Sequence, residues 1–271
     1  MRMVAALAFA ASAFLAGCME TEPLETQAEL LLVAPYVGQG HGVALVRGNR
    51  AVVFDAGPGE QSALRQELTN VGVERIEWVV LTHPDLDHAG GLDSLGIPAE
   101  GLLHGRWSES ESLSLAPFCR SLPKGCLQVQ APQSLSVLGD ATLEVFHDGT
   151  HGLDEEPNSR SLVADVSWNG ASRFLVSGDL DTTGELSLLP WIRRTDVVQL
   201  GHHGSRSSAH LAWLGRAAPR YALVQAGLDN GFGHPTAQAL ARVAAVGADL
   251  LMPRGKSIIV RWNPELDVVG R

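Results

Sequence analysis

The sequence predicts an α/β (α+β) protein with a four-layer αββα sandwich. The order of its segments carries this prediction: apolar strands, a helix, a polar cluster and further strands come first, and a similar order returns in the second half. With 271 residues, 45% of them apolar, the chain can bury a core of that size. Its 29 glycines and 14 prolines fit the many turns of a loop-rich fold.

The N-terminal residues are expected to be a targeting signal outside the fold. A basic start at Arg2 precedes an apolar run over 4–16, which is too short for a permanent membrane span. The sequence Leu15-Ala16-Gly17-Cys18 is similar to a bacterial lipobox, which implies cleavage before Cys18 and acylation of that cysteine. An ordinary signal peptide that contains a cysteine is the alternative.

This start sets the expected domain organisation and location. We expect four segments: a lipoprotein signal peptide over 1–17, a tether over 18–28, one folded domain over 29–262 and a C-terminal tail over 263–271. The protein is then expected to be a periplasmic or cell-surface lipoprotein, held to the membrane only through the lipid on Cys18.

Apolar runs predict the elements of the first half. In order they are strands over 29–33, 43–46 and 51–54, a helix over 61–71, a strand over 76–81, a short helix over 92–95 and a strand over 101–104. The spacing of Leu64, Leu68 and Val71 gives the long helix one apolar face, and Gly72 ends it. The insertion over 108–130 is irregular and is a candidate lid or substrate wall.

The second half repeats this pattern of strands and helix. The predicted elements are strands over 141–147, 171–177, 196–200 and 221–226, a helix over 237–246 and closing strands over 250–252 and 257–262.

One stretch of the chain, T-H-P-D-L-D-H-A-G-G from Thr82, gathers residues that bind metals. It places His83, Asp85, Asp87 and His88 within six residues, directly after the buried strand over 76–81. The first two can converge on one ion, whereas the adjacent second two diverge and can serve another. Mixed imidazole and carboxylate ligands suit Zn²⁺, Mn²⁺ or Fe²⁺ better than Ca²⁺ or Mg²⁺. A polar helix start with aspartate caps and a surface histidine is the alternative.

This stretch resembles the H-x-[HD]-x-D-H signature of the metallo-β-lactamase superfamily, and its form is most similar to the hydrolase domain of ComEC competence proteins. Further matches follow in the family's order: apolar-D-x-G at Asp55, N-x-x-S-L-V from Asn158, Gly-Asp at Asp179, H-H-G-S from His202 and N-x-[YF]-G-H-P from Asn230. The chain departs from the ComEC motif D-V-G-Q-G-D-A at Tyr36 and His41, which replace acidic residues.

The resemblance implies a role for each matched residue. The metal ligands would be His83, Asp85, Asp87, His88, Asp179 and His202, with Asp179 bridging two ions. Asp85 or Asp87 would steer the proton of the attacking water, and His234 would protonate the leaving group or hold a phosphate oxygen. The substrate would contact Asn158, His203, Ser205 and Arg206, and support of a metal ligand is the alternative role for His203. Asp55 would orient a ligand, with a turn cap as its alternative reading.

The first of the two implied metal sites is expected to be the weaker one. Many superfamily members have a histidine near Asn158 as a third ligand, but this chain has the ComEC-like N-x-x-S-L-V there. His147 or His151 are the alternatives for that place. The carboxylate of Asp85 in place of an imidazole also hardens the site and favours Mn²⁺ over Zn²⁺.

Two of the three cysteines remain once Cys18 carries lipid. Cys119 and Cys126 are separated by six residues that include a proline and a glycine, which predicts a local disulfide in an oxidising compartment. Two free buried thiols are the alternative.

Together these features predict a metal-dependent hydrolase of the phosphodiesterase or nuclease type, using one or two Zn²⁺ or Mn²⁺ ions to activate a water molecule as hydroxide. Its substrate would be a small-molecule or nucleic-acid phosphodiester. The formal net charge of −10 argues against a general grip on nucleic acid and favours the first alternative, a hydrolase of carboxylic esters, lactones or amides. A non-catalytic metal-binding lipoprotein is the second alternative.

Overall fold

The computed structural model describes residues 29–59, 63–149, 157–263 and 265–270. The expected signal peptide, the tether and Cys18 lie outside these residues, as does His151. Within the described part of the chain, none of the helices has both the length and the hydropathy needed to cross a bilayer.

The first sheet has eight strands in the order β15-β14-β1-β2-β3-β4-β5-β6. Its strands are β1 (Leu30–Ala34), β2 (Val43–Arg47), β3 (Arg50–Phe54), β4 (Arg75–Leu81), β5 (Leu102–His104), β6 (Cys126–Gln128), β14 (Ile258–Asn263) and β15 (Glu265–Gly270). The strands from β15 to β3 pair antiparallel, and those from β3 to β6 pair parallel. The parallel part carries the metal-binding stretch at the end of β4.

The second sheet has seven strands in the order β13-β12-β11-β10-β9-β8-β7. Its strands are β7 (Gln133–Val137), β8 (Ala141–His147), β9 (Val163–Trp168), β10 (Ala171–Val176), β11 (Thr195–Gln199), β12 (Tyr221–Leu223) and β13 (Asp249–Leu251). Here β7 to β10 pair antiparallel and β10 to β13 pair parallel, so both sheets are mixed.

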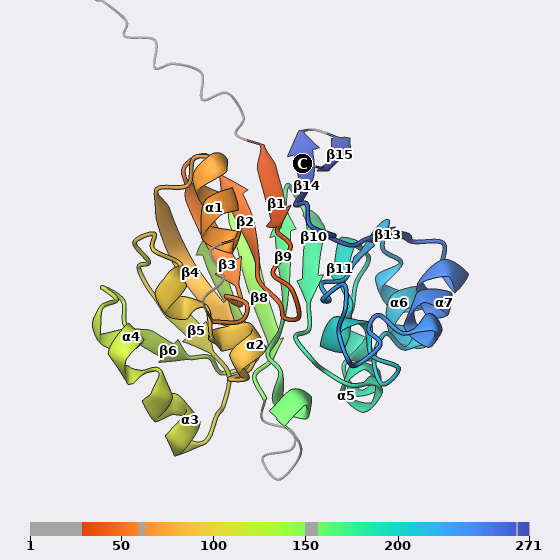
Figure 1. Ribbon diagram of the computed structural model, residues 1–271, viewed down its shortest axis with the longest axis horizontal. Coiled ribbons are helices and arrows are strands. Elements are labelled where there is room, and N and C mark those ends of the chain that lie inside the picture. The colour runs from red at the N-terminus through yellow and green to blue at the C-terminus, as the bar shows by residue number, and fades with distance from the viewer. Residues whose placement is uncertain (1–28, 60–62, 150–156, 264, 271) are drawn as a thin grey trace, which may run out of the picture.

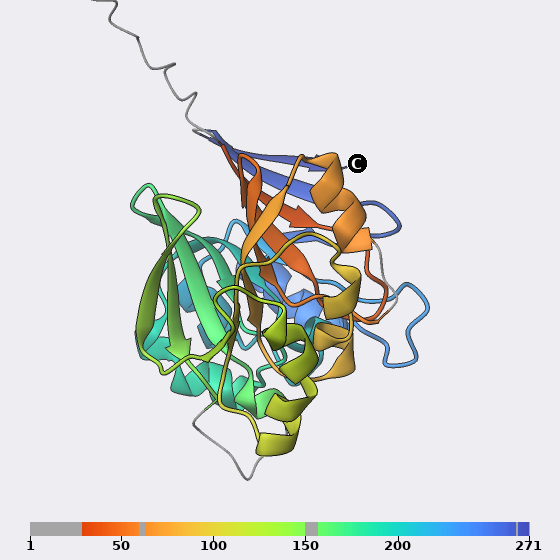
Figure 2. The ribbon, with the colours of Figure 1, turned by 90° about the vertical axis from the view of Figure 1, so that its left-hand side faces the viewer.

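Helices cover the outer faces of both sheets (Figures 1 and 2). The first group is α1 (Ala63–Asn70), α2 (Leu86–Ala89), α3 (Glu109–Ser114) and α4 (Ala116–Arg120), and the second is α5 (Thr182–Ser187), α6 (Leu211–Ala217) and α7 (Ala237–Ala245). Alternating strand residues of both sheets fill a central core, in which Phe54 and Phe174 meet edge to face. Two further apolar clusters lie under the two groups of helices. The four-layer αββα sandwich predicted from the sequence is therefore confirmed.

Several segments are more regular than expected from the sequence. The strands β7 and β9 and the helices α5 and α6 are absent from the expected elements. The insertion over 108–130 contains α3, α4 and β6. Most of the expected C-terminal tail forms β15, an edge strand of the first sheet. Its Leu266 and Val268 alternate with exposed residues, as in a strand with one buried face, and pack against the central core. Its backbone pairs antiparallel with β14.

Candidate metal centre

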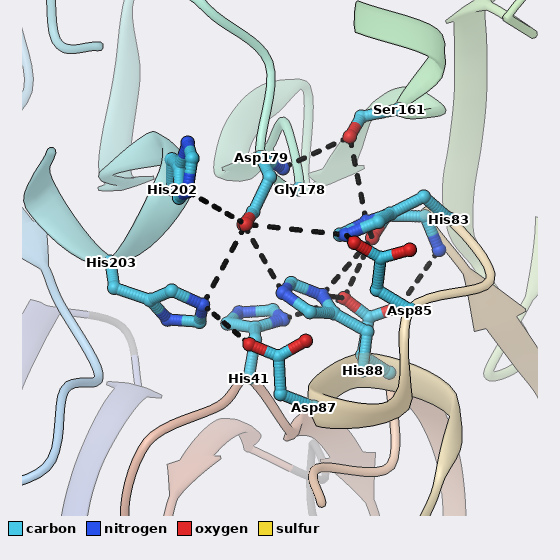
Figure 3. A network of polar contacts seen from close by, with 12 residues as sticks. His41, His83, Asp85, Asp87, His88, Ser161, Gly178, Asp179, His202 and His203 are labelled. Atoms are coloured by element: carbon cyan, nitrogen blue, oxygen red, sulfur yellow. Dashed lines mark hydrogen bonds and ion pairs between the residues drawn. The ribbon is translucent and has the colours of Figure 1, made fainter. Parts of the chain in front are cut away.

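Loops from both sheets bring one group of polar side chains together (Figure 3). In the first sheet, Asp55 follows β3, residues 82–88 follow β4, and His41 lies between β1 and β2. In the second sheet, Asp179 follows β10, and His202 and His203 follow β11 in the 3₁₀ turn Gly201–Gly204.

Asp55 is the buried anchor of this group and has no exposed side-chain surface. Its Oδ1 accepts the backbone N–H of Thr82 at 2.8 Å. Its Oδ2 accepts hydrogen bonds from the Thr82 hydroxyl at 2.8 Å, from His88 Nδ1 at 2.7 Å and from His41 Nδ1 at 2.9 Å. Burial alone would raise the pKa of Asp55, but His88 and His41 hold it below its ordinary value. The ionised carboxylate thus fixes two imidazole rings.

Hydrogen bonds at Nδ1 leave the Nε2 atoms of His83 and His88 directed toward Asp179. His88 Nε2 lies 3.1 Å from Asp179 Oδ1, and His83 Nε2 lies 4.0 Å from Asp179 Oδ2. The Thr82 hydroxyl donates to Asp55, so it accepts from His83 Nδ1 at 3.0 Å. Burial lowers the pKa of His83 to about 3, which keeps this ring neutral with a free lone pair.

Asp179 is the carboxylate on which these rings converge. Its backbone N–H donates to Ser161 Oγ at 3.0 Å. The preceding Gly178 has a φ of +54°, and a Cβ on it would lie 2.7 Å from the Thr82 side chain, which explains the Gly-Asp pair. Burial opposes ionisation of Asp179, but its histidine neighbours, His88 above all, hold its pKa well below the ordinary value.

The pair His202-His203 has an unusual backbone that sends the two rings to different places. Both residues have left-handed backbone angles, with φ of 48° and 53°. His203 is buried, donates from Nδ1 to the Gln225 carbonyl at 3.0 Å and places Nε2 3.2 Å from Asp87 Oδ2. His202 is 30% exposed, and its Nε2 lies 3.8 Å from Asp179 Oδ2.

Asp85 and Asp87 form the open side of the centre. Their side chains are 44% and 36% exposed, whereas those of His83, His88 and Asp179 are almost fully buried. Burial and the nearby Asp87 raise the pKa of Asp85. Burial also acts to raise the pKa of Asp87, but the hydrogen bond from His203 and the charges of His88 and His203 together outweigh it and lower this pKa. The two carboxylates therefore differ in proton affinity.

The donor set fits a divalent metal ion. His83 Nε2, His88 Nε2 and Asp179 Oδ1 are buried atoms without a hydrogen-bond partner, and a cation would satisfy all of them. Ligand atoms of His83, His88 and Asp179 lie within 4.8 Å of one another, as do those of Asp87, His88 and His203. Burial lowers the pKa of His88, but Asp179 and Asp55 outweigh it and raise this pKa well above the ordinary value, so an ion bound here would replace a proton.

Of the residues expected to contact the substrate or the leaving group, Asn158 and His234 lie against His202. Asn158 Nδ2 lies 3.3 Å from His202 Nδ1, and the ring of His234 meets that of His202 edge to face at 5.7 Å. Ser205 is buried, with its Oγ 3.0 Å from Ser207 Oγ. Arg206 is exposed, and its backbone carbonyl accepts from Arg242 at 3.0 Å.

Comparison with known proteins places the chain in a family. A model described as the metallo-beta-lactamase superfamily matches residues 35–97. Competence protein ComA of Neisseria gonorrhoeae is 34% identical over 220 residues, which cover 79% of this chain and 29% of ComA. The chain belongs to the metallo-beta-lactamase superfamily. It is related to competence proteins of the ComA/ComEC type, and it spans less than a third of the length of the curated relatives that it matches.

Solved structures, among them a metallo-beta-lactamase fold protein, share the fold at low sequence identity. The protein YhfI from Bacillus subtilis gives a TM-score of 0.59 at 12% identity, covering 89% of this chain and all (100%) of YhfI. Zn²⁺-bound PqqB from Methylobacterium extorquens gives 0.56 at 13% identity, covering 82% of this chain and 98% of PqqB.

Sequence reasoning gave too little weight to two histidines of this metallo-beta-lactamase centre. His41, in sequence only a departure from the family motif, is buried and its Nδ1 donates a hydrogen bond to Asp55. Gly40 just before it has a φ of +150°, and a Cβ there would lie 2.5 Å from the Asp87 carbonyl, so the loop packs tightly on α2. His203, expected to face substrate, lies among the metal-capable side chains. The sequence signal that points to a packed position for His41 is the glycine on either side of it, Gly40 and Gly42.

Of the two histidines considered as third ligand of the first site, the structure describes His147 and not His151. His147 is buried, and its Nδ1 lies 2.9 Å from the carbonyl oxygen of Ser161, next to the loop that holds Asp179. Asn158 stands where many superfamily members have a histidine ligand, and its predicted contact with the substrate stays a prediction.

The insertion is fastened at two points. Cys119 and Cys126 are joined by a disulfide, with Cα atoms 5.2 Å apart. Arg160, which is buried, makes a two-pronged ion pair with Glu111 of α3 at 3.0 and 3.1 Å. Since Arg160 is two residues from Asn158, this ion pair connects the insertion to the rim of the metal centre.

A buried carboxylate supports the loop that follows His203 and gives the protein a pH-dependent stability. Glu185 of α5 is fully buried and accepts the backbone N–H groups of Ala209 at 2.7 Å and His210 at 2.6 Å. Burial raises its pKa from 4.5 to about 7. The folded state therefore holds a proton that the unfolded state releases between these two values, and its stability falls as the pH rises through that range.

We expect Glu185→Gln, which has no charge to titrate, to remove this slope. The wild type should lose on the order of 3 kcal/mol more unfolding free energy than the variant between about pH 4.5 and 7. Urea unfolding of both proteins at several pH values measures the difference. Parallel pH profiles would show that Glu185 ionises in the folded state as readily as in the unfolded chain.

Proposed function

We propose that this metallo-beta-lactamase-fold protein is a metal-dependent hydrolase of phosphodiesters. The observation that carries the proposal is the convergence of unpartnered buried atoms of His83, His88 and Asp179 beside the half-exposed Asp85 and Asp87. A bound divalent ion would supply Lewis acidity and lower the pKa of water bound to it. The relationship to ComA/ComEC-type proteins supports phosphodiester chemistry over other hydrolyses.

The burial and charge of the surrounding residues indicate which of them would bind the ions and which would accept a proton. His83, His88, Asp179, Asp87 and one of the His202-His203 pair would hold the ions. Asp85, with its raised pKa and open position, is suited to take up the proton of the attacking water.

His234 is suited to the leaving-group side. Burial and the nearby His202 lower its pKa, so the ring is neutral near pH 7. Its backbone is held by Asn230, whose Nδ2 donates to the His234 carbonyl at 2.7 Å and whose Oδ1 accepts the His234 N–H at 2.9 Å. The fixed ring can hold a phosphate oxygen through its N–H.

An activity panel with controlled metal tests the proposal. The protein is stripped with a chelator, reloaded with Zn²⁺ or Mn²⁺, and assayed on bis(p-nitrophenyl) phosphate, single-stranded DNA, p-nitrophenyl acetate and a lactone. We expect turnover of the two phosphodiesters only, and only with metal. Turnover confined to the acetate or the lactone would establish the alternative, a carboxylic ester or lactone hydrolase, which the formal charge of −10 favours.

We also propose that the protein is a lipoprotein of the periplasm or cell surface. The Leu15-Ala16-Gly17-Cys18 motif and the Cys119–Cys126 disulfide, which suits an oxidising compartment, support this. In cells fed labelled palmitate, wild type should incorporate label and Cys18→Ser should not. Equal labelling of both proteins would contradict the proposal.

A further inference from the structure

The loop over 227–234 presents an aromatic ring to solvent beside the metal centre. Phe232 is 71% exposed, the second most exposed of the large apolar side chains in the described part of the chain. One face of its ring stacks on His234, with centroids 5.7 Å apart and planes at 23°. The rings of His234 and His202 are in contact in turn, and His202 Nε2 is 3.8 Å from Asp179. A continuous row of rings therefore leads from Phe232 to the metal ligands.

Hydrogen bonds within the loop fix the backbone around Phe232, so its ring stays at the surface. Asn230 accepts the N–H groups of Phe232 at 3.2 Å and His234 at 2.9 Å, and it donates to the Gly227 and His234 carbonyls, both at 2.7 Å. The loop is also tied to the β1–β2 loop, since Gly227 N–H donates to the Gln39 side chain at 3.1 Å. A ring fixed in this way loses little conformational freedom when it stacks on a ligand.

We propose that Phe232 is a stacking platform for an unpaired nucleobase next to the scissile phosphate. Base–aromatic stacking accepts every base, because each has a π face, and it discriminates against duplexes and diesters that lack a free ring. The short row of rings from Asp179 to Phe232 places the platform within reach of a nucleotide whose phosphate lies at the metal centre. Phe232 therefore determines specificity and is not part of the bond-breaking machinery. This inference rests on the proposed phosphodiester chemistry.

Matched substrates separate stacking from backbone binding. The metal-loaded protein is assayed on a single-stranded thymidine oligonucleotide and on an abasic strand with the same phosphates. Phe232→Ala should lower kcat/KM on the thymidine strand roughly 5- to 150-fold, mainly through KM, and leave the abasic strand unchanged. Phe232→Trp should restore the preference. Leu228→Ala, which removes another exposed apolar side chain of the same loop, is the control and should change neither substrate.

Two outcomes would overturn the inference. An equal loss on both strands would show that Phe232 only supports His234, and an unchanged preference in Phe232→Ala would show that no base stacks there. Binding of the same strands, followed by fluorescence anisotropy, keeps the test independent of turnover. If no phosphodiester is cleaved but Phe232→Ala still weakens binding of the thymidine strand alone, the platform stands and the proposed hydrolysis fails.

Discussion

Replacing His88 with alanine is expected to lower hydrolysis at least about a thousandfold, since metal catalysis is worth several kcal/mol of barrier. Among the described residues, three groups of histidine and carboxylate side chains could hold a metal ion, and His88 belongs to all of them. Its loss removes a ligand and leaves Asp55 and Asp179 facing an empty space. Elemental analysis should show loss of the tightly bound ion, and turnover of bis(p-nitrophenyl) phosphate measures activity. His210→Asn, which changes a histidine outside the centre and keeps a helix-capping side chain, is the control.

The companion variant Asp85→Ala ranks the two expected metal sites. Asp85 is half exposed, and its Oδ2 lies 3.7 Å from His83 Nε2, so it belongs to the more open side. We expect this variant to keep about one ion per chain and to lose most of the stimulation by added Mn²⁺. If Asp85→Ala strips all metal while His88→Ala retains it, the ranking is reversed, and His147 or His151 becomes the candidate that completes the first site.

Asp55→Ala should produce the largest loss of stability, about 3–5 kcal/mol of unfolding free energy, as expected when one partner of a buried charged cluster is removed. The change leaves hydrogen-bond donors of His41, His88 and Thr82 buried and unpaired. Urea unfolding at pH 7 without metal measures this loss apart from any effect of ligand binding.

Two further variants define the size of this effect. Arg75→Ala breaks an ion pair with Glu100 at the surface, where Arg75 is 62% exposed, and should cost less than about 1 kcal/mol. Asp55→Asn keeps the acceptor for the Thr82 N–H but turns an amide toward two imidazole donors, so we expect an intermediate loss. A loss for Asp55→Ala no larger than that for Arg75→Ala would show that the cluster is not a structural anchor.

Local patterns predict most of the fold because each element has a strong period. The alternation in 141–147 becomes β8, and the apolar run over 76–81 lies within β4. The sequence does not predict the C-terminal strand, because β15 lies at the edge of its sheet and only its Leu266 and Val268 pack against the core. A half-exposed strand of this kind has a weak apolar signal.

The sequence likewise predicts one part of the metal centre and not the other. Sequence spacing predicts that residues 83–88 gather ligands, because they are neighbours in the chain. It does not predict which of His202 and His203 lies among the metal-capable side chains. That depends on the left-handed backbone of both residues, which turns the ring of His203 toward Asp87. The place of His41 depends on packing of the β1–β2 loop against α2, a contact between segments far apart in the sequence.

Each sheet supplies only part of the candidate metal centre, so the centre can form only after both halves of the chain have been made. Asp55, His83, Asp87 and His88 come from the first half of the chain, whereas Asp179, His202 and His203 come from the second. A chain still emerging from the ribosome, with only its first half made, therefore has an incomplete set of donors. The proposed hydrolysis therefore requires both halves of the chain to be folded together.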